Sequence, residues 1–569
     1  QRFPVRDPFF MMIRRSLNTF MNAFTSSDWT AYPFASQNHK DFNNLLEVYL
    51  DAVFFARLDP LDFAQEGHRL ELEKTELGKS HLVYKGVVYN EMKGAMSSIT
   101  SQLWQALCRY LYPYTTYHYN SGGEPNHIPS LSYDQLMAFY RHHYHPANAV
   151  FMTFGDIPAW EHQQRFEKYA LGHFERQSIE LAVADENRYF SPLRVQEGYA
   201  VVADDNQARS HVVMGWLLGH STDLAGQLQA NLLSRVLLDN SASPLRHLLE
   251  TCGLGSALSP LCGLEESNRE MAFVCGIEGA ETDIADTFER QVLDCLHEVV
   301  NQGVPQAQVE AALHQLELSQ REVGGDGYPY GLQLILSCLS GAIHGGDALA
   351  LLNLDAVLKK LHTDILNPRY IPNLVQTLLL DNPHRVRLVL VPDAALAQYR
   401  DTQEQCKLQR LMRAMTESEL QQVQRQTKIL LERQQQTDNA DILPKLNRDD
   451  IPLTLSIPQP SWVDQKQRWT FYNQATNGLV YHQLVIDLAS IPQAQMPLLG
   501  LLSRLITEVG LANQDYLQVQ ERQASICGNL SAYISLRGGK ANENNACGFF
   551  YIIHKRLDKS TGCYSTVTD

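Results

Sequence analysis

Long apolar runs and paired cysteines are both missing from this 569-residue sequence. No uninterrupted run of about eighteen apolar residues occurs, so we expect no membrane-spanning helix. The ten cysteines are scattered singly without a Cys-x-x-Cys pair. This pattern predicts free thiols in a reducing compartment and neither a disulfide framework nor a zinc ribbon. Phosphate-loop spacing and Gly-x-Ser-x-Gly nucleophile motifs are absent as well.

Basic charge is in short supply. Lysine and arginine total 47 against 63 aspartates and glutamates, which gives a net charge of −16. This balance argues against a nucleic-acid partner and fits basic peptide ligands, although most acidic side chains in any protein are simply solvated. The apolar fraction of 44% and the charged fraction of 19% are typical of a globular protein. The length suffices for three or four domains.

The inverted zinc motif His-x-x-Glu-His is not found. His247-Leu248-Leu249-Glu250 comes nearest, but Thr251 stands where the second histidine is required. We interpret this segment as an ordinary amphipathic helix that ends at Gly253. The histidine-rich run 141–145 is followed by Pro146, and its spacing does not place three imidazoles on one helical face. We therefore expect a helix end there, with a metal site as the weaker alternative.

One carboxylate stands out in the segment Val83–Gly94. Val87 and Val88 lie four and three residues before Glu91, so all three share one face of a predicted helix. We expect this face to be buried, where a carboxylate costs roughly several kcal/mol unless a cation or hydrogen bonds stabilise it. The alternative is a surface glutamate.

Several blocks of the sequence resemble the presequence-protease branch of the pitrilysin/insulinase metallopeptidases, in order and with similar spacing over nearly the whole chain. The blocks are Arg2–Phe9, Ser16–Thr25, Tyr49–Phe55, Gln65-Glu66-Gly67, Lys85–Gly94 and His143-Tyr144-His145-Pro146. The resemblance implies a zinc metalloendopeptidase whose cofactor is Zn²⁺ and whose substrates are unfolded peptides, among them targeting presequences.

The resemblance also assigns roles to individual residues. Glu91 matches the third zinc ligand, and Glu66 and Asn90 are candidates for supporting positions around it. The two imidazole ligands and the general base are expected upstream of Gln1, so we expect no catalytic residue within this chain and an inactive polypeptide. We further expect a fragment that also lacks the C-terminal domain of the family.

The segment Asn22-Ala23-Phe24 matches an exposed strand edge that pairs with the substrate main chain in the family. By resemblance, these three residues bind substrate. The alternative is a plain sheet strand with Phe24 in the core.

The predicted fold class is α+β, with repeated domains of antiparallel-rich sheet and helices packed on one side. A strand pair with an amphipathic helix occurs three times. The pairs are Asn22–Thr25 with Thr30–Ala35, Ser256–Leu264 with Glu270–Ile277, and Leu530–Leu536 with Cys547–Ile553; the helices are Lys40–Phe54, Glu281–Val300 and Met496–Glu508. We place domain boundaries at 1–180, 193–395 and 451–569, with a linker at 396–450.

The Gln-rich segment Leu396–Asp438 carries two series of apolar residues at helical spacing. They are Leu408, Leu411, Met412 and Met415, followed by Leu420, Val423, Ile429 and Leu430. Ser418 is a candidate N-cap of its second helix. We predict two antiparallel helices that bridge the second and third units. A coiled-coil oligomerisation arm is the alternative, but its heptads are short and irregular.

By resemblance, the parent protein degrades peptides within a closed chamber of two halves. We expect a monomer without nucleic-acid or membrane partners, cytoplasmic in a bacterium and in the mitochondrial matrix in a eukaryote. A non-catalytic scaffold or peptide-binding homologue is the alternative function.

Overall fold

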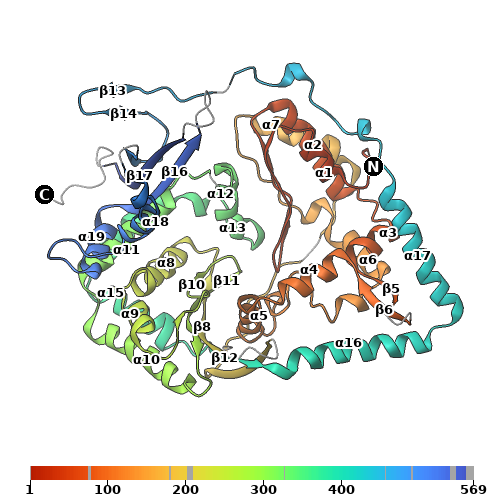
Figure 1. The fold of residues 1–569 in the computed structure, drawn as a ribbon, viewed down its shortest axis with the longest axis horizontal. Helices are drawn as coiled ribbons and strands as arrows, with labels where there is room; N and C mark the ends of the chain where they lie inside the picture. Colours follow the sequence, from red (N-terminus) through yellow and green to blue (C-terminus); the bar gives the residue numbers. More distant parts are fainter. Residues whose placement is uncertain are drawn as a thin grey trace.

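The computed structural model describes residues 2–74, 79–178, 181–201, 209–325, 327–454, 456–488, 491–538 and 546–558. Three units follow one another along the chain, and two long helices lie between the second and the third (Figure 1). Mixed helices and mostly antiparallel sheets confirm the α+β class.

The first unit begins with a helix and an extended hairpin. Helix α1 spans Pro8–Ile13, and the strands are β1 (Asn18–Met21), β2 (Phe24–Thr25), β3 (Thr30–Ala31) and β4 (Phe34–Ser36). β1 pairs with β4 and β2 with β3, both antiparallel. Helix α2 (His39–Phe54) follows, capped by Asn38, whose side chain accepts the Asp41 amide at 3.0 Å. The predicted helix is confirmed here, and the predicted strand pair is confirmed in part, because residues 22–23 and 32–33 lie outside the strands.

The rest of the first unit is mostly helical. Its further elements are α3 (Pro60–Asp62), the π-helix η1 (Phe63–Gly67), β5 (Arg69–Lys74), β6 (Ser80–Lys85), α4 (Val87–Ala95), α5 (Ile99–Leu111), α6 (Tyr133–His143) and α7 (Ala159–Tyr169), with 3₁₀ turns η2 (Thr116–His118), η3 (Ile128–Ser130), η4 (Pro146–Asn148) and η5 (Leu171–His173). Among the described residues of this unit, strands pair only two by two. The histidine-rich run ends α6, as predicted.

The second unit holds a six-stranded sheet in the order β10-β11-β8-β12-β7, with β9 also paired to β11. The strands are β7 (Leu193–Ala200), β8 (Ser210–His220), β9 (Ala257–Leu258), β10 (Gly263–Glu265), β11 (Glu270–Ala280) and β12 (Arg385–Asp393). Only β7 and β12 run parallel. The helices are α8 (Leu224–Leu238), α9 (Pro244–Thr251), α10 (Ala285–Gln302), α11 (Gln306–Arg321), α12 (Tyr330–Ser337), α13 (Leu339–Ile343), α14 (Leu354–Asp364) and α15 (Tyr370–Val375), with η6 (Ala350–Leu352) and η7 (Gln376–Leu380).

Both faces of this sheet are covered. Met214 and Trp216 of β8 point into a large core with helices α8 and α10, whereas Val213 and Leu217 point to the opposite face, as the alternation of a strand requires. That opposite face packs against α5, which comes from the first unit. Gly215 allows this approach, since a Cβ there would lie 3.2 Å from Leu107 of α5. The first and second units therefore share one core.

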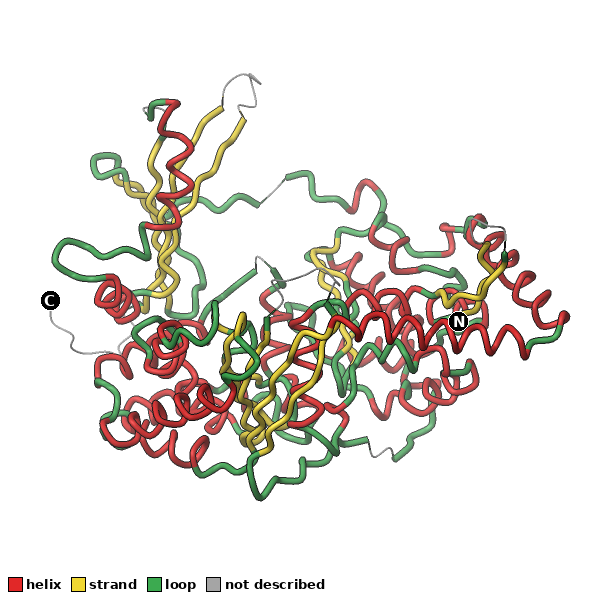
Figure 2. The backbone as a smooth tube through the Cα atoms, turned by 60° about the horizontal axis from the view of Figure 1, so that its bottom comes forward, coloured by secondary structure: helices red, strands yellow, loops and turns green. Residues whose placement is uncertain are grey.

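The third unit is smaller. A hairpin of β13 (Trp462–Asp464) and β14 (Trp469–Phe471) precedes an antiparallel sheet in the order β15-β17-β16, formed by Leu479–Asp487, Ala546–Leu557 and Gly528–Gly538. The turn η10 (Gln493–Gln495) and helices α18 (Met496–Leu505) and α19 (Tyr516–Ile526) lie between β15 and β16. In Figure 2 this sheet stands at the upper left, apart from the six-stranded sheet.

The two long helices between these units are α16 (Ala394–Ala414) and α17 (Glu417–Gln435). Of the two predicted apolar series, Leu408, Val423 and Leu430 are buried, whereas Leu411 and Ile429 are 37% and 47% exposed. The predicted antiparallel packing is wrong: α16 packs on β6 and β7, α17 packs on β5, and the pair follows two sides of the first unit (Figure 1). The cap of α17 is Thr416 and not Ser418, because Thr416 and Glu419 form a capping box.

Residues 436–450 then return along the first unit, through the turns η8 (Ala440–Ile442) and η9 (Arg448–Asp450). Asp438 accepts the Arg6 amide at 2.8 Å, and Lys40 pairs with Asp450 at 2.7 Å. Leu443 is buried in a small core with Phe3 and Val5. The linker thus packs mainly on the first unit, and α16 also contacts β7 of the second unit.

No helix in the described ranges has the length and apolar character needed to cross a membrane. The nine cysteines within those ranges are free thiols, and Cys563 lies outside them.

Candidate functional site

The start of α4 is fixed by two glycines. Gly86 lies directly before the helix with φ of +155°, and a Cβ at this position would lie 2.1 Å from the carbonyl oxygen of Gly67. Only glycine tolerates both the dihedral angle and the close approach. The blocks Gln65-Glu66-Gly67 and Lys85–Gly94, which are separate in the sequence, therefore touch in the fold.

Glu91 lies on α4, as predicted, but not on a buried face. Its side chain is exposed, and Val87 and Val88 are 41% and 39% exposed. The buried residue of the helix is Tyr89, at 3% exposure. The expectation of a buried Glu91 face is wrong because α4 packs through the side that carries Tyr89. Glu91 has no hydrogen bond or ion pair within the described residues, and Asn90 is exposed beside it.

A carboxylate from α16 holds the buried side of α4. The Tyr89 hydroxyl donates to Glu404 Oε2 at 3.0 Å, and Lys93 Nζ lies 3.0 Å from the same oxygen. Burial and the neighbouring Glu404 carboxylate raise the pKa of Tyr89, so its hydroxyl remains a donor. Tyr89 lies two residues before Glu91, and Lys93 lies two residues after it. Because Glu404 binds both, it fixes the helix that carries Glu91.

The described residues do not form a metal site. No cluster of three histidine, cysteine, aspartate or glutamate side chains with ligand geometry occurs among them. Glu66 is exposed and accepts the Gln65 side-chain amide at 2.8 Å. His143 bonds the Phe139 carbonyl, and His145 accepts the Ala147 amide. The Glu91 carboxylate is free to bind a cation but supplies only one ligand. Catalytic zinc takes about three ligands from a protein.

His247 likewise belongs to an ordinary helix, as predicted. α9 ends at Thr251, whose hydroxyl bonds the His247 carbonyl at 2.7 Å, and Gly253 follows with φ of +68°.

Asn22 and Ala23 lie at the break between β1 and β2, and both are exposed. The Asn22 amide donates to the Pro33 carbonyl at 3.1 Å, across the hairpin. The Ala23 amide lies at the interruption between the two strands. Its acceptor there is the neighbouring side-chain oxygen of Asn22, at 2.8 Å. The outer edge carries no partner strand among the described residues.

Phe24 is half-buried and does not enter the core of the first unit. Its ring packs edge-on against Tyr328 of the second unit, with centroids 5.9 Å apart, and Phe20 packs against the same tyrosine at 5.5 Å. No local pattern in the sequence points to Tyr328, since about 300 residues separate it from the hairpin.

The tip of the hairpin is fastened to the second unit as well. Asp28 accepts the Tyr117 hydroxyl at 2.7 Å, and His344 Nε2 lies 3.3 Å from the same carboxylate. Thr116 also bonds the Ser27 carbonyl at 2.9 Å. The hairpin is therefore held at its tip and along its middle while its outer edge stays open.

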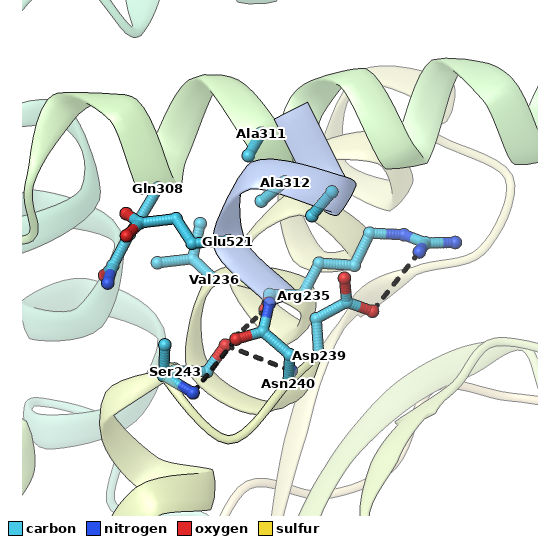
Figure 3. Close-up of a pocket in the computed structure, with 11 residues that line it drawn as sticks. Arg235, Val236, Asp239, Asn240, Ser243, Gln308, Ala311, Ala312 and Glu521 are labelled. Carbon is cyan, nitrogen blue, oxygen red and sulfur yellow. Dashed lines mark hydrogen bonds and ion pairs between the residues drawn. The ribbon is translucent and has the colours of Figure 1, made fainter. Parts of the chain in front are cut away.

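Two cavities lie away from Glu91. An open cleft of about 450 Å³ separates Trp104 of α5 from the edge strand β10. A second cavity of about 20 Å³ lies between α8, α11 and α19, lined by Arg235, Asp239 and Glu521 among others (Figure 3). The second has room for about one water molecule, and it marks the contact between the second and third units.

Comparison with protein families gives two matches. Residues 130–316 match the family described as Peptidase M16 inactive domain. Residues 390–564 match a second family, described as associated with the C group of the M16 peptidases. The first match spans the boundary between the first and second units, whose shared core is described above.

Among curated proteins, the mitochondrial presequence protease of Danio rerio is 36% identical over 535 residues, which is 93% of this chain and 52% of that protein. Presequence protease 1, chloroplastic/mitochondrial, of Arabidopsis thaliana is 32% identical over 94% of this chain and 50% of its own length. Protein HypA of Clostridium perfringens is 28% identical over 99% and 58%. This chain spans about half the length of the curated relatives it matches.

Among solved structures, the periplasmic protease PqqL from Escherichia coli aligns with a TM-score of 0.48 at 12% identity, over 98% of this chain and 60% of that chain. The sequence relatives are more informative than this structural likeness. On the identity to the presequence proteases and the two family matches, the chain belongs to the pitrilysin/insulinase (M16) peptidase family and is presequence-protease-like.

Proposed function

We propose that the chain forms the peptide-docking part of a zinc metalloendopeptidase that degrades short unfolded peptides, targeting presequences among them. The observation that carries this proposal is the open outer edge at Asn22-Ala23-Phe24, where the Ala23 amide has only a neighbouring side chain as its acceptor. A peptide strand can replace that weak local acceptor with its own carbonyl. Main-chain pairing is largely independent of side chains, which suits an enzyme that accepts many unrelated sequences.

Zinc belongs to the same proposal. The exposed and unbonded Glu91 is available as one ligand, and the remaining ligands would have to come from residues outside this sequence. After dialysis the 569-residue chain should contain far less than one zinc per chain by elemental analysis. In a longer protein that supplies the remaining ligands, Glu91→Gln should lower the zinc content, whereas the control Glu432→Gln, at an exposed carboxylate of α17, should leave it unchanged. Stoichiometric zinc in the 569-residue chain would contradict the assignment.

The names of the relatives support a mitochondrial location if the source is a eukaryote. For cleavage inside a closed chamber, the support is the family resemblance alone. A non-catalytic scaffold or peptide-binding homologue is the second candidate. The match to a domain described as inactive favours it. If a longer protein cleaves peptides and Glu91→Gln abolishes this cleavage, the non-catalytic alternative is excluded.

The docking itself is testable in the 569-residue chain. Ala23→Pro removes the main-chain amide, whereas Ala23→Val retains this amide and replaces one apolar side chain with another. Binding of labelled unstructured peptides, followed by fluorescence anisotropy, should weaken in Ala23→Pro and persist in Ala23→Val. Equal binding by both variants and the parent chain would contradict main-chain docking at this edge.

A further inference from the structure

Three aromatic rings gather beside the open edge of the hairpin. Phe20 and Phe24 come from β1 and β2, and Tyr328 comes from the segment between α11 and α12. The ring centroids are 6.0 Å apart for Phe20–Phe24, 5.5 Å for Phe20–Tyr328 and 5.9 Å for Phe24–Tyr328. Such contacts are in the range that aromatic pairs favour. We call these three residues the aromatic shelf.

The break in the hairpin brings the first two rings together. In a straight strand, residues four apart are separated by about 13 Å along the chain. The rings of Phe20 and Phe24 lie far closer than that, and the strand is interrupted between them at Asn22-Ala23. The aromatic shelf and the Ala23 amide, which has no main-chain acceptor, thus lie at one irregularity.

The shelf is not sealed. Phe20 and Phe24 are half-buried, and Tyr328 is 42% exposed with a hydroxyl that has no hydrogen bond among the described residues. By contrast, the rings of the shared core, such as Trp216 and Phe273, are almost wholly buried. Apolar surface therefore remains available next to the place where a peptide main chain would pair.

Tyr328 is firmly placed although it lies outside any helix or strand. Gln333 of α12 donates to its carbonyl oxygen at 3.2 Å, and Tyr330, two residues further on, packs against Phe154 of the first unit at 6.0 Å. Upstream in the same segment, Glu322 pairs with Lys555 of the third unit. All three units thus fix the segment that presents Tyr328.

We propose that Tyr328 is a specificity-determining residue that, with Phe20 and Phe24, contacts apolar side chains of a peptide docked on the Asn22–Phe24 edge. The proposal rests on the proposed function, because it requires a peptide on that edge. Backbone pairing supplies affinity for any extended chain, and the aromatic shelf adds a preference for apolar side chains. The second unit thereby takes part in selecting peptides that pair with the first.

The test uses the 569-residue chain and two labelled peptides of equal length and charge. One carries leucine and phenylalanine at alternate positions, and the other has serine there. The parent chain should prefer the apolar peptide. Tyr328→Ala should weaken binding of the apolar peptide by about three- to tenfold, the range of one aromatic contact, and leave the serine peptide unchanged. Tyr328→Phe should behave as the parent chain, as should the control Tyr114→Ala at an exposed tyrosine.

Other outcomes separate the two proposals. If Tyr328→Ala weakens both peptides equally, the tyrosine only supports the hairpin and the specificity role is wrong. If Tyr328→Ala leaves the apolar preference intact while Ala23→Pro weakens both peptides, docking stands and the shelf proposal fails. If Ala23→Pro changes the binding of neither peptide, the proposal of docking on this edge is wrong, and so is the shelf proposal.

Discussion

The sheets of the second and third units differ most in what covers them. In the second unit, α8 and α10 cover one face and α5 the other, so Trp216 and Leu217 on opposite faces are both fully buried. In the third unit the core is small, and large apolar residues remain in contact with solvent, Leu484 at 55% and Leu536 at 73% exposure. Folding free energy from burial is therefore concentrated in the core that the first and second units share. In the third unit, exposed apolar side chains do not contribute this folding free energy.

The largest effect should come from the shared core. Leu107→Ala removes a fully buried side chain of α5 that packs against β8, and the cost should be about 2–5 kcal/mol, the range of such truncations. Calorimetry should show the main unfolding transition at a clearly lower temperature. A change of less than about 0.5 kcal/mol would mean that α5 and the sheet do not form one cooperative core.

A pH titration sharpens the comparison within the same core. His384 is fully buried, its Nε2 bonds the Leu111 carbonyl at 2.9 Å, and burial lowers its pKa to about 4. The unfolded histidine titrates at about 6.5, so the unfolded state binds more protons between about pH 6.5 and 4. Stability should be complete above about pH 6.5 and fall by up to about 3 kcal/mol toward pH 4. His297→Gln, at an exposed histidine, should leave this profile unaltered, and His384→Gln should flatten it.

The contact between α4 and α16 should give an intermediate effect. Glu404→Ala leaves the buried Tyr89 hydroxyl without its acceptor, which should cost about 1–3 kcal/mol locally. Hydrogen exchange of the α4 amides should accelerate about tenfold or more. Glu432→Ala, which removes a carboxylate from an exposed pair on α17, is the matched control and should leave α4 unchanged. Equal protection of α4 in both variants would show that Glu404 does not hold it.

The third unit should give the smallest effect. Leu501→Ala on α18 removes a side chain that is already 56% exposed, so the free energy of unfolding of the 569-residue chain should change by no more than about 0.5 kcal/mol. A cost similar to that of Leu107→Ala would show that α18 is covered in solution and would remove the contrast between the two sheets.

Local patterns predicted several of the helices and strands but not what covers them. The amphipathic helix α2 was predicted correctly, whereas the apolar series of α16 and α17 contain both the buried Leu408 and Val423 and the exposed Leu411 and Ile429. The face of α4 was assigned wrongly because Val87, Val88 and Glu91 span barely one turn, and the side that packs is chosen by Glu404, far along the chain. The capping box of Thr416 and Glu419 was readable in the sequence, whereas the turn of α17 away from α16 depends on the surface of the first unit.

The long separation between Tyr89 and Glu404 also orders events during synthesis. The two residues are 315 positions apart, so α4 leaves the ribosome well before the acceptor of its buried hydroxyl exists. At a translation rate of about 5–20 residues per second, the interval is roughly 16–60 s. Throughout that time Tyr89 of the nascent α4 lacks the Glu404 carboxylate, and its side chain can make other contacts. We expect the first unit to remain a client of chaperones until α16 has emerged.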